Sequence, residues 1–95
     1  MVRPCIRRFI RGRPNSFYFK PAGKRLVELE ETILTLDEFE AIRLIDLENT
    51  PQEQAAKQMK ISQPTLSRIL KTARKKLSEA IIKGKAIKIE KLVAP

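Results

Sequence analysis

Apolar residues recur every three or four positions through the second half of the chain. The residues that share this spacing are Leu66, Ile69, Leu70, Ala73, Leu77, Ala80 and Ile81. In a helix they form one continuous stripe, which is the pattern of an amphipathic helix. Ser62 is a favourable N-cap for this helix, and Gly84 directly after Lys83 is typical of a helix end. The pattern therefore predicts a long helix over residues 63–83.

A shorter helix is predicted directly upstream, over residues 52–59. Thr50 suits the N-cap, Pro51 suits the first helical position, and Glu53 stands where it completes a capping box. The inner face of this helix consists of three apolar residues: Ala55, Ala56 and Met59. The two alanines are small enough to allow another helix to approach closely.

Three residues, Lys60 to Ser62, separate the two predicted helices. A short capped helix, a tight turn and a long amphipathic helix together predict a helix-turn-helix, in which Ile61 fills the corner between the helices. The turn needs a residue with positive φ, for which glycine is usual, and Lys60 in that position costs about 1 kcal/mol. An αα-hairpin that serves packing alone is the alternative interpretation.

The side of the long helix opposite the apolar stripe is polar and basic. A recognition helix places its first turns against base edges in the major groove, where Gln pairs with adenine, Arg with guanine, and Ser or Thr with either. The predicted base-reading residues are Gln63, Pro64, Thr65, Ser67 and Arg68. The predicted phosphate-binding residues further along are Lys71, Thr72, Arg74, Lys75 and Lys76. A solvated basic face without a ligand is the alternative, above all for Lys75 and Lys76.

A third helix is predicted from Thr35 to about Leu47. Thr35 and Glu38 form a capping box, and Asp37 and Glu38 complement the helix N-terminus. The apolar face of this helix comprises Leu36, Phe39, Ile42, Leu44, Ile45 and Leu47. Asn49 is suited to end it. The acidic side of the helix is expected to face away from DNA and is formed by Glu40, Asp46 and Glu48.

The first 14 residues are rich in arginine and are interrupted by proline and glycine. Four of these arginines are predicted to bind phosphates: Arg7, Arg8, Arg11 and Arg13. In one interpretation the segment is a flexible arm that follows phosphates or enters a minor groove. In the other it is an ordered extended segment whose Ile6, Phe9 and Ile10 dock on the core. Both interpretations stay open and can hold together.

Three further segments favour extended structure. Residues 17–19, Phe-Tyr-Phe, favour a brief strand; their rings pack on the helical core, which is the preferred interpretation, or stack on the bases of a single strand. Residues 26–33 fit a short extended stretch or a helical turn. Residues 86–92 alternate in part between apolar and charged residues and predict a strand. An isolated strand is unstable, so this one needs the aromatic segment, the Leu26–Leu29 region or a second chain as its partner.

Composition narrows the class of protein. A chain of 95 residues is long enough for one domain. We divide it into a basic N-terminal arm and extended segment (1–34), a helix-turn-helix region (35–83) and a short C-terminal strand and tail (84–95). The net charge of +9 and the pI near 10.1 favour a polyanionic partner. The charge is segregated, because residues 26–53 carry −8 whereas residues 1–25 and 54–95 carry +8 and +9.

Few residues that support metal or nucleophile chemistry are present. The chain has no histidine and one cysteine, Cys5, which excludes the usual zinc sites and the Ser-His and Cys-His nucleophile pairs. We therefore expect neither catalysis nor a metal or cofactor. The longest apolar run has three residues, so neither a transmembrane helix nor a secretory signal is expected, and a single cysteine fits a reducing cytosol.

Several motifs resemble known families. Residues 35–81, TLDEFEAIRLIDLENTPQEQAAKQMKISQPTLSRILKTARKKLSEAI, resemble region four of bacterial sigma factors and related response-regulator output domains. The motifs FKPAG at 19–23, LDEFEAIRLIDLE at 36–48, SQPTLSRIL at 62–70 and GKAIKIE at 84–90 resemble a small prokaryotic family, the domain of unknown function 134, whose members are predicted to bind DNA. This resemblance covers nearly the whole chain. It implies a mainly α fold, a helical bundle with a helix-turn-helix and short extended segments at the N- and C-termini.

These observations predict a sequence-specific double-stranded DNA-binding protein, a transcription regulator of the cytoplasm and nucleoid. We expect a homodimer that reads two half-sites about one helical turn apart, because a single small module gives limited specificity. One alternative is a sigma-like or architectural protein that acts through RNA polymerase or by bending DNA. Others are an RNA-binding protein that uses the arginines and the aromatic cluster, and a protein-interaction adaptor that docks through the acidic helix at 36–48.

Overall fold

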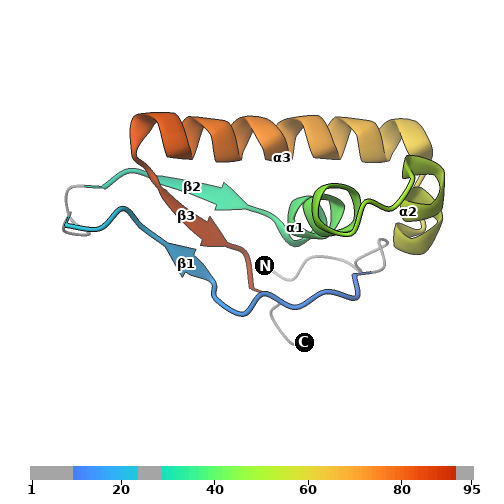
Figure 1. The fold of residues 1–95 in the computed structure, drawn as a ribbon, viewed down its shortest axis with the longest axis horizontal. Coiled ribbons are helices and arrows are strands. Elements are labelled where there is room, and N and C mark those ends of the chain that lie inside the picture. Colours follow the sequence, from blue (N-terminus) through green and yellow to red (C-terminus); the bar gives the residue numbers. More distant parts are fainter. Residues whose placement is uncertain (1–9, 24–28, 92–95) are drawn as a thin grey trace, which may run out of the picture.

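The computed structural model describes residues 10–23 and 29–91. The elements follow in the order β1 (Tyr18–Phe19), β2 (Glu31–Leu34), α1 (Leu36–Ile42), η2 (Arg43–Leu47), α2 (Gln52–Met59), α3 (Gln63–Lys83) and β3 (Ala86–Ile89). Figure 1 shows α1 and α2 against the N-terminal half of α3 and the small sheet against its C-terminal half. The predicted fold class, mainly α with short strands, is confirmed.

The three strands form one sheet in the order β1-β3-β2. Strand β3 pairs antiparallel with β1 and parallel with β2, so that Tyr18 and Ile33 both lie opposite Lys88. The C-terminal strand predicted over residues 86–92 is shorter than expected, since β3 ends at Ile89. The aromatic segment is one of its partners, as predicted, and its second partner is β2, which lies downstream of the predicted Leu26–Leu29 region. The sequence leaves the conformation of residues 26–33 open. In the structure residues 31–33 are extended in β2, and residues 26–28 lie outside the described residues.

The capping box predicted at the start of α1 is present. The Thr35 hydroxyl accepts a hydrogen bond from the backbone N–H of Glu38 at 3.3 Å, and the Glu38 carboxylate accepts one from the backbone N–H of Thr35 at 2.9 Å. The helix then widens into the π-helical turn η2, which no feature of the sequence signals. There the backbone N–H of Glu48 donates to the Arg43 carbonyl at 2.9 Å. Asn49 follows with a φ of 58°, a left-handed conformation that asparagine tolerates well.

The turn between α2 and α3 has the predicted geometry. Lys60 adopts the left-handed conformation, with φ of 58° and ψ of 44°. Ser62 caps α3, and Gly84 ends it with a φ of 70°, which a glycine adopts without strain. The bounds of both helices agree with the prediction.

The predicted N-cap of α2 is wrong by one residue. Pro51, which was expected in the first helical position, is the N-cap and makes no side-chain capping bond. Thr50 belongs to the preceding turn instead, since its backbone N–H donates to the Leu44 carbonyl at 2.8 Å.

Two apolar clusters lie along the buried side of α3. The first apolar cluster lies beneath its N-terminal half and consists of Ala41, Leu44, Ala55, Ala56, Met59, Leu66 and Leu70. The second apolar cluster lies against the sheet and consists of Leu34, Leu36, Ala73 and Ile89. Partly buried residues border the second cluster, namely Ile10, Phe17, Phe39, Ile42 and Ile87.

Two members of the predicted apolar faces lie outside these clusters. Ile81 is 77% exposed, because the buried line of α3 runs from Ala73 to Ala80 and the next residue lies about 100° further around the helix. Leu47 is 72% exposed, because the widened turn of η2 moves it out of register with the buried Leu44.

Candidate nucleic-acid interface

Helix α3 begins at an ordered cap. The Ser62 hydroxyl accepts a hydrogen bond from the backbone N–H of Thr65 at 3.2 Å and donates one to the Thr65 hydroxyl at 2.8 Å. The Thr65 hydroxyl also accepts a bond of 3.5 Å from the Arg68 guanidinium. These contacts fix the first turn of α3 and draw Arg68 toward its N-terminal end.

One line of exposed residues follows the outward side of α3. They recur at i, i+4, i+7 and i+11, and so share one helix face: Pro64, Arg68, Lys71 and Lys75. We call this set the outward line. Within the described ranges, no carboxylate forms an ion pair with any of its three cations. Their charges are therefore available to an anion from outside.

The other predicted base-reading residues flank the outward line in the first two turns. Gln63 and Ser67 are exposed on one side of it, and half-buried Thr65 lies on the other. Thr72, a predicted phosphate contact, is exposed one turn after Arg68. The structure thus gathers these polar side chains around Arg68 on one surface, and their contacts with bases and phosphates stay predictions.

Two of the predicted phosphate-binding cations are engaged within the protein. Arg74 donates to the Asp46 carboxylate from Nη2 at 2.6 Å and from Nε at 3.2 Å, and these bonds raise the pKa of its guanidinium. Lys76 donates from Nζ to the Glu38 carboxylate at 2.8 Å and to the Ile33 carbonyl at 2.7 Å. Lys76 therefore serves the packing of α3 on α1 and β2 rather than a phosphate, and a phosphate at Arg74 must compete with Asp46.

The described part of the predicted arginine arm is held against α1. The backbone N–H groups of Arg11 and Gly12 donate to the Glu40 carboxylate at 3.0 and 3.1 Å. A Cβ atom at residue 12 would collide with the Arg43 side chain, so glycine permits this close approach.

This segment is docked, and it still presents charge. Ile10 packs against the second apolar cluster, while Arg11 and Arg13 are exposed. For residues 10–14 the interpretation as an ordered docked segment is therefore confirmed. Arg7 and Arg8 lie outside the described residues.

Glu40 is 1% exposed, so the expectation that it belongs to an acidic outer face is wrong. Its carboxylate accepts bonds from Nε and Nη2 of Arg43, each at 2.9 Å. Burial by itself raises the pKa of Glu40, but the Arg43 guanidinium and the two backbone N–H groups outweigh burial and hold the pKa below its usual value. The Asp46 carboxylate is bound by Arg74, and Oε2 of Glu48 lies 3.4 Å from Nη1 of Arg43. These carboxylates are used within the fold, which disfavours an adaptor that docks through them.

Lys57 is a cation that the sequence reasoning did not single out. It is exposed in the last turn of α2, on the side opposite the buried Ala55 and three residues before Lys60. Because the turn is short, this position adds positive charge beside the start of α3. The apolar pattern of α2 contained the signal, since it leaves Lys57 on the outer side.

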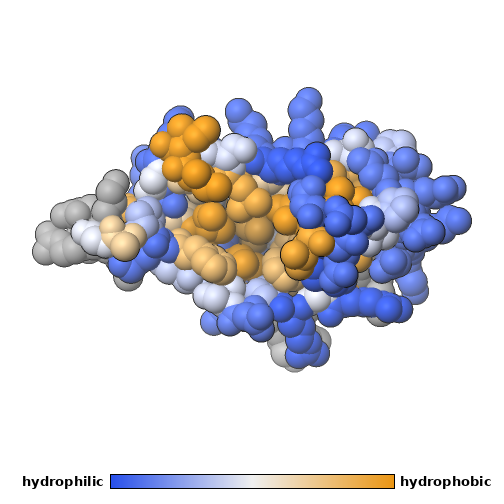
Figure 2. Space-filling model, viewed as in Figure 1, coloured by the Kyte–Doolittle hydropathy of each residue, from blue (hydrophilic) through white to orange (hydrophobic). Residues whose placement is uncertain are grey.

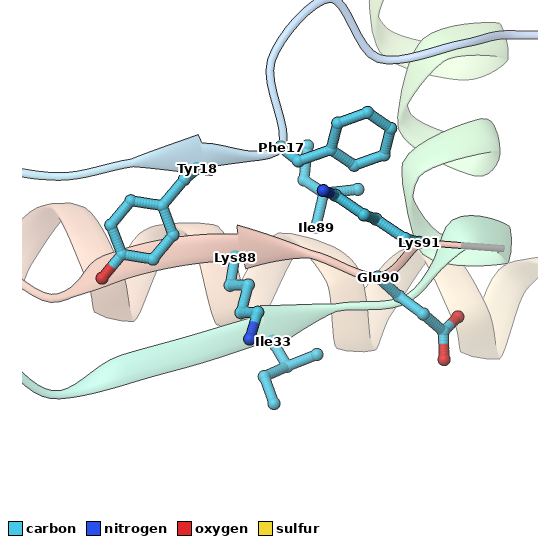
Figure 3. A pocket seen from close by; sticks show the side chains of 7 residues that line it. All are labelled: Phe17, Tyr18, Ile33, Lys88, Ile89, Glu90 and Lys91. Atoms are coloured by element: carbon cyan, nitrogen blue, oxygen red, sulfur yellow. The ribbon is translucent and has the colours of Figure 1, made fainter. Parts of the chain in front are cut away.

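The outer face of the sheet carries further aromatic and basic side chains. Tyr18, Lys88 and Ile33 point out from the three strands in one cross-strand row and line a hollow of about 560 Å³ (Figure 3). The Tyr18 hydroxyl donates to the Glu31 carboxylate at 2.8 Å, and this bond raises the pKa of Tyr18. Tyr18 therefore faces away from the helices, in contrast to the preferred packing interpretation.

The other two aromatic residues of this segment differ from each other. Phe17 packs against the second apolar cluster as predicted, and Nζ of Lys91 lies 5.2 Å from the centre of its ring. Phe19 is 51% exposed on the edge strand β1, and it lines a hollow together with Ala80 and Ile81 of α3. Only one ring of the three therefore serves the core.

No helix within the described residues is long and apolar enough to cross a membrane. In the same ranges, no three side chains of His, Cys, Asp or Glu gather where they could hold a metal ion. What the outward face of α3 offers is hydrogen-bonding and cationic side chains, with Arg68 at their centre.

Comparison with known proteins places nearly the whole sequence in one family. The family model described as "Protein of unknown function DUF134" matches residues 1–91. A UPF0251 protein of Caldanaerobacter subterraneus subsp. tengcongensis is 52% identical over 90 residues, which cover 95% of this chain and 76% of the relative. UPF0251 proteins of Thermoanaerobacter pseudethanolicus and Aeromonas salmonicida are 49% and 47% identical over 95% of this chain, and over 76% and 88% of their own lengths. No solved structure matches the chain. The chain therefore belongs to the DUF134 family of proteins of unknown function.

Proposed function

We propose that α2, the turn at residues 60–62 and α3 form a helix-turn-helix, and that the protein is a sequence-specific DNA-binding transcription regulator. One observation carries this proposal. The three cations of the outward line have no carboxylate partner among the described residues, whereas Arg74 and Lys76 on the flanks of the same helix do. Positive charge that the fold does not use is suited to a polyanion.

The proposal gives the two parts of this surface different roles. The first two turns of α3 enter the major groove, where Arg68 pairs with guanine and Gln63 with adenine, and Ser67 bonds either base. Phosphates beside the groove are bound by Lys71, Thr72 and Lys75, and the docked N-terminal segment adds Arg11 and Arg13. The protein performs no catalytic step and needs no cofactor for this function.

A module of this size reads few base pairs. The proposal therefore includes a homodimer that binds two half-sites about 34–36 Å apart, one turn of the duplex. An architectural protein that binds every duplex alike through its phosphates is the competing function that an experiment must distinguish.

The test is a selection from a random duplex library at near-physiological salt, with the wild type and the Arg68→Ala variant. We expect one enriched motif in the wild type. The Arg68→Ala variant should lose its base preference at one position of that motif. Its binding to the wild-type motif should be weaker by about 1–3 kcal/mol. Two copies of the motif one turn apart would support the homodimer.

Lys75→Ala and Lys83→Ala provide a matched pair for the phosphate role. Lys75→Ala should weaken binding to all duplexes alike and reduce the slope of log K against log salt by about one unit. Lys83 lies at the far end of α3 beside Glu79, at 3.3 Å, and its substitution should change neither quantity. Equal binding of all sequences with a steep salt slope would reject the specific regulator and favour the architectural protein. Absence of duplex binding would reject both.

A further inference from the structure

Arg74 lies among the exposed side chains of the candidate interface. Gln63, Ser67 and Arg74 recur at i, i+4 and i+11, so they share one line of α3 beside the outward line. Figure 2 shows that mostly hydrophilic side chains cover the surface formed by α2 and the first turns of α3, at the right of the view. In the proposed complex these turns lie in the groove. Arg74, about three turns along the helix, then lies where the phosphates beside the groove pass.

The guanidinium of Arg74 is held by a carboxylate from another element. Asp46 of η2 accepts hydrogen bonds from Nη2 of Arg74 at 2.6 Å and from Nε at 3.2 Å. Both side chains are open to solvent, with exposed fractions of 53% for Arg74 and 39% for Asp46. The ion pair therefore lies at the surface, where a phosphate from outside can reach it.

This ion pair is poorly placed to hold the fold together. Lys76, by contrast, bonds a carboxylate that is 8% exposed and also the Ile33 carbonyl, and so joins α3 to α1 and β2. Within the described ranges, Arg74 bonds Asp46 alone. An exposed pair contributes little to folding, because water and salt screen it. Its clear effect is on the interface, where it neutralises one cation and places a negative charge beside it.

We propose that Asp46 masks Arg74 and so limits the affinity of the protein for duplex DNA. The inference rests on the proposed function and concerns the strength of the same interface. A phosphate at Arg74 must displace the Asp46 carboxylate or share the guanidinium with it, and the two anions repel each other. Without the mask, Arg74 would hold one more phosphate through a charge-assisted hydrogen bond. Since phosphate contacts attract every sequence alike, Asp46 lowers the affinity for all duplexes.

The test compares three variants with the wild type. Asp46→Asn keeps the shape of the side chain and removes its charge. Glu48→Gln is the matched control, because it removes the same charge two residues away, from a carboxylate that pairs with Arg43 instead. The double variant Asp46→Asn/Arg74→Ala lacks both the mask and the cation. Thermal melts show that each variant is folded, which we expect because the substituted residues are exposed.

Each protein is titrated into two labelled duplexes, one with the selected motif and one of scrambled sequence, over a range of salt concentrations. Fluorescence anisotropy measures the affinity. Asp46→Asn should bind both duplexes about threefold to tenfold more tightly at near-physiological salt, and its slope of log K against log salt should steepen by about one unit. Glu48→Gln should change the affinity by less than about twofold. The double variant should lose the gain, and the base preference should be the same in all variants.

Four results would overturn the inference while the proposed function stands. The first is an affinity of Asp46→Asn equal to that of the wild type. The second is weaker binding by Asp46→Asn, because Asp46 would then orient Arg74 toward the duplex. The third is an equal gain in Glu48→Gln, which would show a general effect of charge. The fourth is a gain that persists in the double variant. Absence of duplex binding by the wild type and all variants would reject the proposed function, and this inference with it.

Discussion

The two apolar clusters beneath α3 are closed in different ways. The first is sealed by small or flexible side chains of α2, none more than 4% exposed: Ala55, Ala56 and Met59. Partly exposed side chains border both clusters, among them Ile61 and Ile69 at the first and Phe17, Phe39 and Ile87 at the second. Over the first cluster the outer side of α3 is polar. Beside the second, the flank of α3 leaves Ile81 77% exposed.

This difference separates a part of the molecule whose apolar side chains are covered by α2 from a part that leaves apolar side chains such as Ile81 exposed. At the edges of the second cluster, individual polar side chains fix the neighbouring elements in position. Lys76 joins α3 to α1 and β2, and Glu40 holds the N-terminal segment that carries Ile10. Polar contacts of this kind fix positions without covering apolar surface. The elements around the second cluster are therefore fixed in position, while apolar side chains beside it stay exposed.

The largest effect on stability should come from truncating a fully buried leucine. We compare one leucine from each region. Leu66 is fully buried in the first cluster, so Leu66→Ala leaves a closed cavity and should lower the free energy of unfolding by about 3–4 kcal/mol. Leu77 is half-buried and, with Phe39 and Leu47, lines an open hollow of about 320 Å³ beside the second cluster. Leu77→Ala should cost only about 1 kcal/mol, because water can enter the space that the side chain leaves.

Urea unfolding of the two variants measures the contrast directly. Ile82→Ala is the control for helix propensity and exposed surface, since Ile82 is 82% exposed on α3, and it should change stability by less than about 0.5 kcal/mol. Equal losses for Leu66→Ala and Leu77→Ala would mean that the second cluster is as closed as the first.

The next effect concerns the polar contacts that hold the second region. Glu40→Gln removes the negative charge that Arg43 and the backbone N–H groups of Arg11 and Gly12 face inside the protein. We expect a loss of about 2 kcal/mol in the free energy of unfolding, because the glutamine amide keeps one acceptor oxygen and places an NH₂ donor where the other carboxylate oxygen accepts from two N–H donors. Glu48→Gln changes the other carboxylate near Arg43, which is 53% exposed, and should cost less than about 0.5 kcal/mol.

The contribution of the Glu40 carboxylate to the free energy of unfolding should depend on pH in a defined direction. Folding lowers the pKa of Glu40 below its ordinary value of 4.5, so the charged form stabilises the folded state. The stabilisation is complete above that value and is lost as the pH falls through the lower pKa of the folded protein. The stability difference between wild type and Glu40→Gln should therefore shrink on acidification below about pH 4.5. A difference that stays constant down to pH 2 would contradict the assignment.

The sequence predicts those features that depend on neighbours within a few residues. The capping box of Thr35 and Glu38, the Ser62 cap and the left-handed Lys60 all follow from local patterns. The polar surface of the candidate interface also follows, because the apolar stripe of α3 defines which side faces outward. These features need no knowledge of the rest of the fold.

The features that the sequence misses depend on contacts between distant residues. From the sequence, Glu40 is expected on the outer acidic face. In the structure it accepts a hydrogen bond from the backbone N–H of Arg11, which is 29 positions away. From the sequence, Lys76 is expected to contact a phosphate. In the structure it donates to the carboxylate of Glu38, which is 38 positions away. Ile81 has the spacing of a buried residue, and only the structure shows that its side chain is 77% exposed. Periodicity therefore cannot identify this exposed apolar surface, because it assumes that every apolar stripe is covered.

The smallest effect lies at the turn that closes the first cluster. Lys60 has a φ of 58°, where a Cβ atom is strained, and Lys60→Gly removes that strain while it loosens the unfolded chain. The two terms oppose each other, and the net gain should be about 0.5–1 kcal/mol, or roughly 3–6 °C in Tm. Lys60→Ala keeps the Cβ atom and loses the same amine, so it should show no gain, and calorimetry of both variants separates strain from side-chain contacts. A gain of equal size in Lys60→Ala would place the effect in the lysine side chain. A loss in Lys60→Gly alone would show that the first cluster, although complete, is held by a turn that depends on the stiffness of a non-glycine residue.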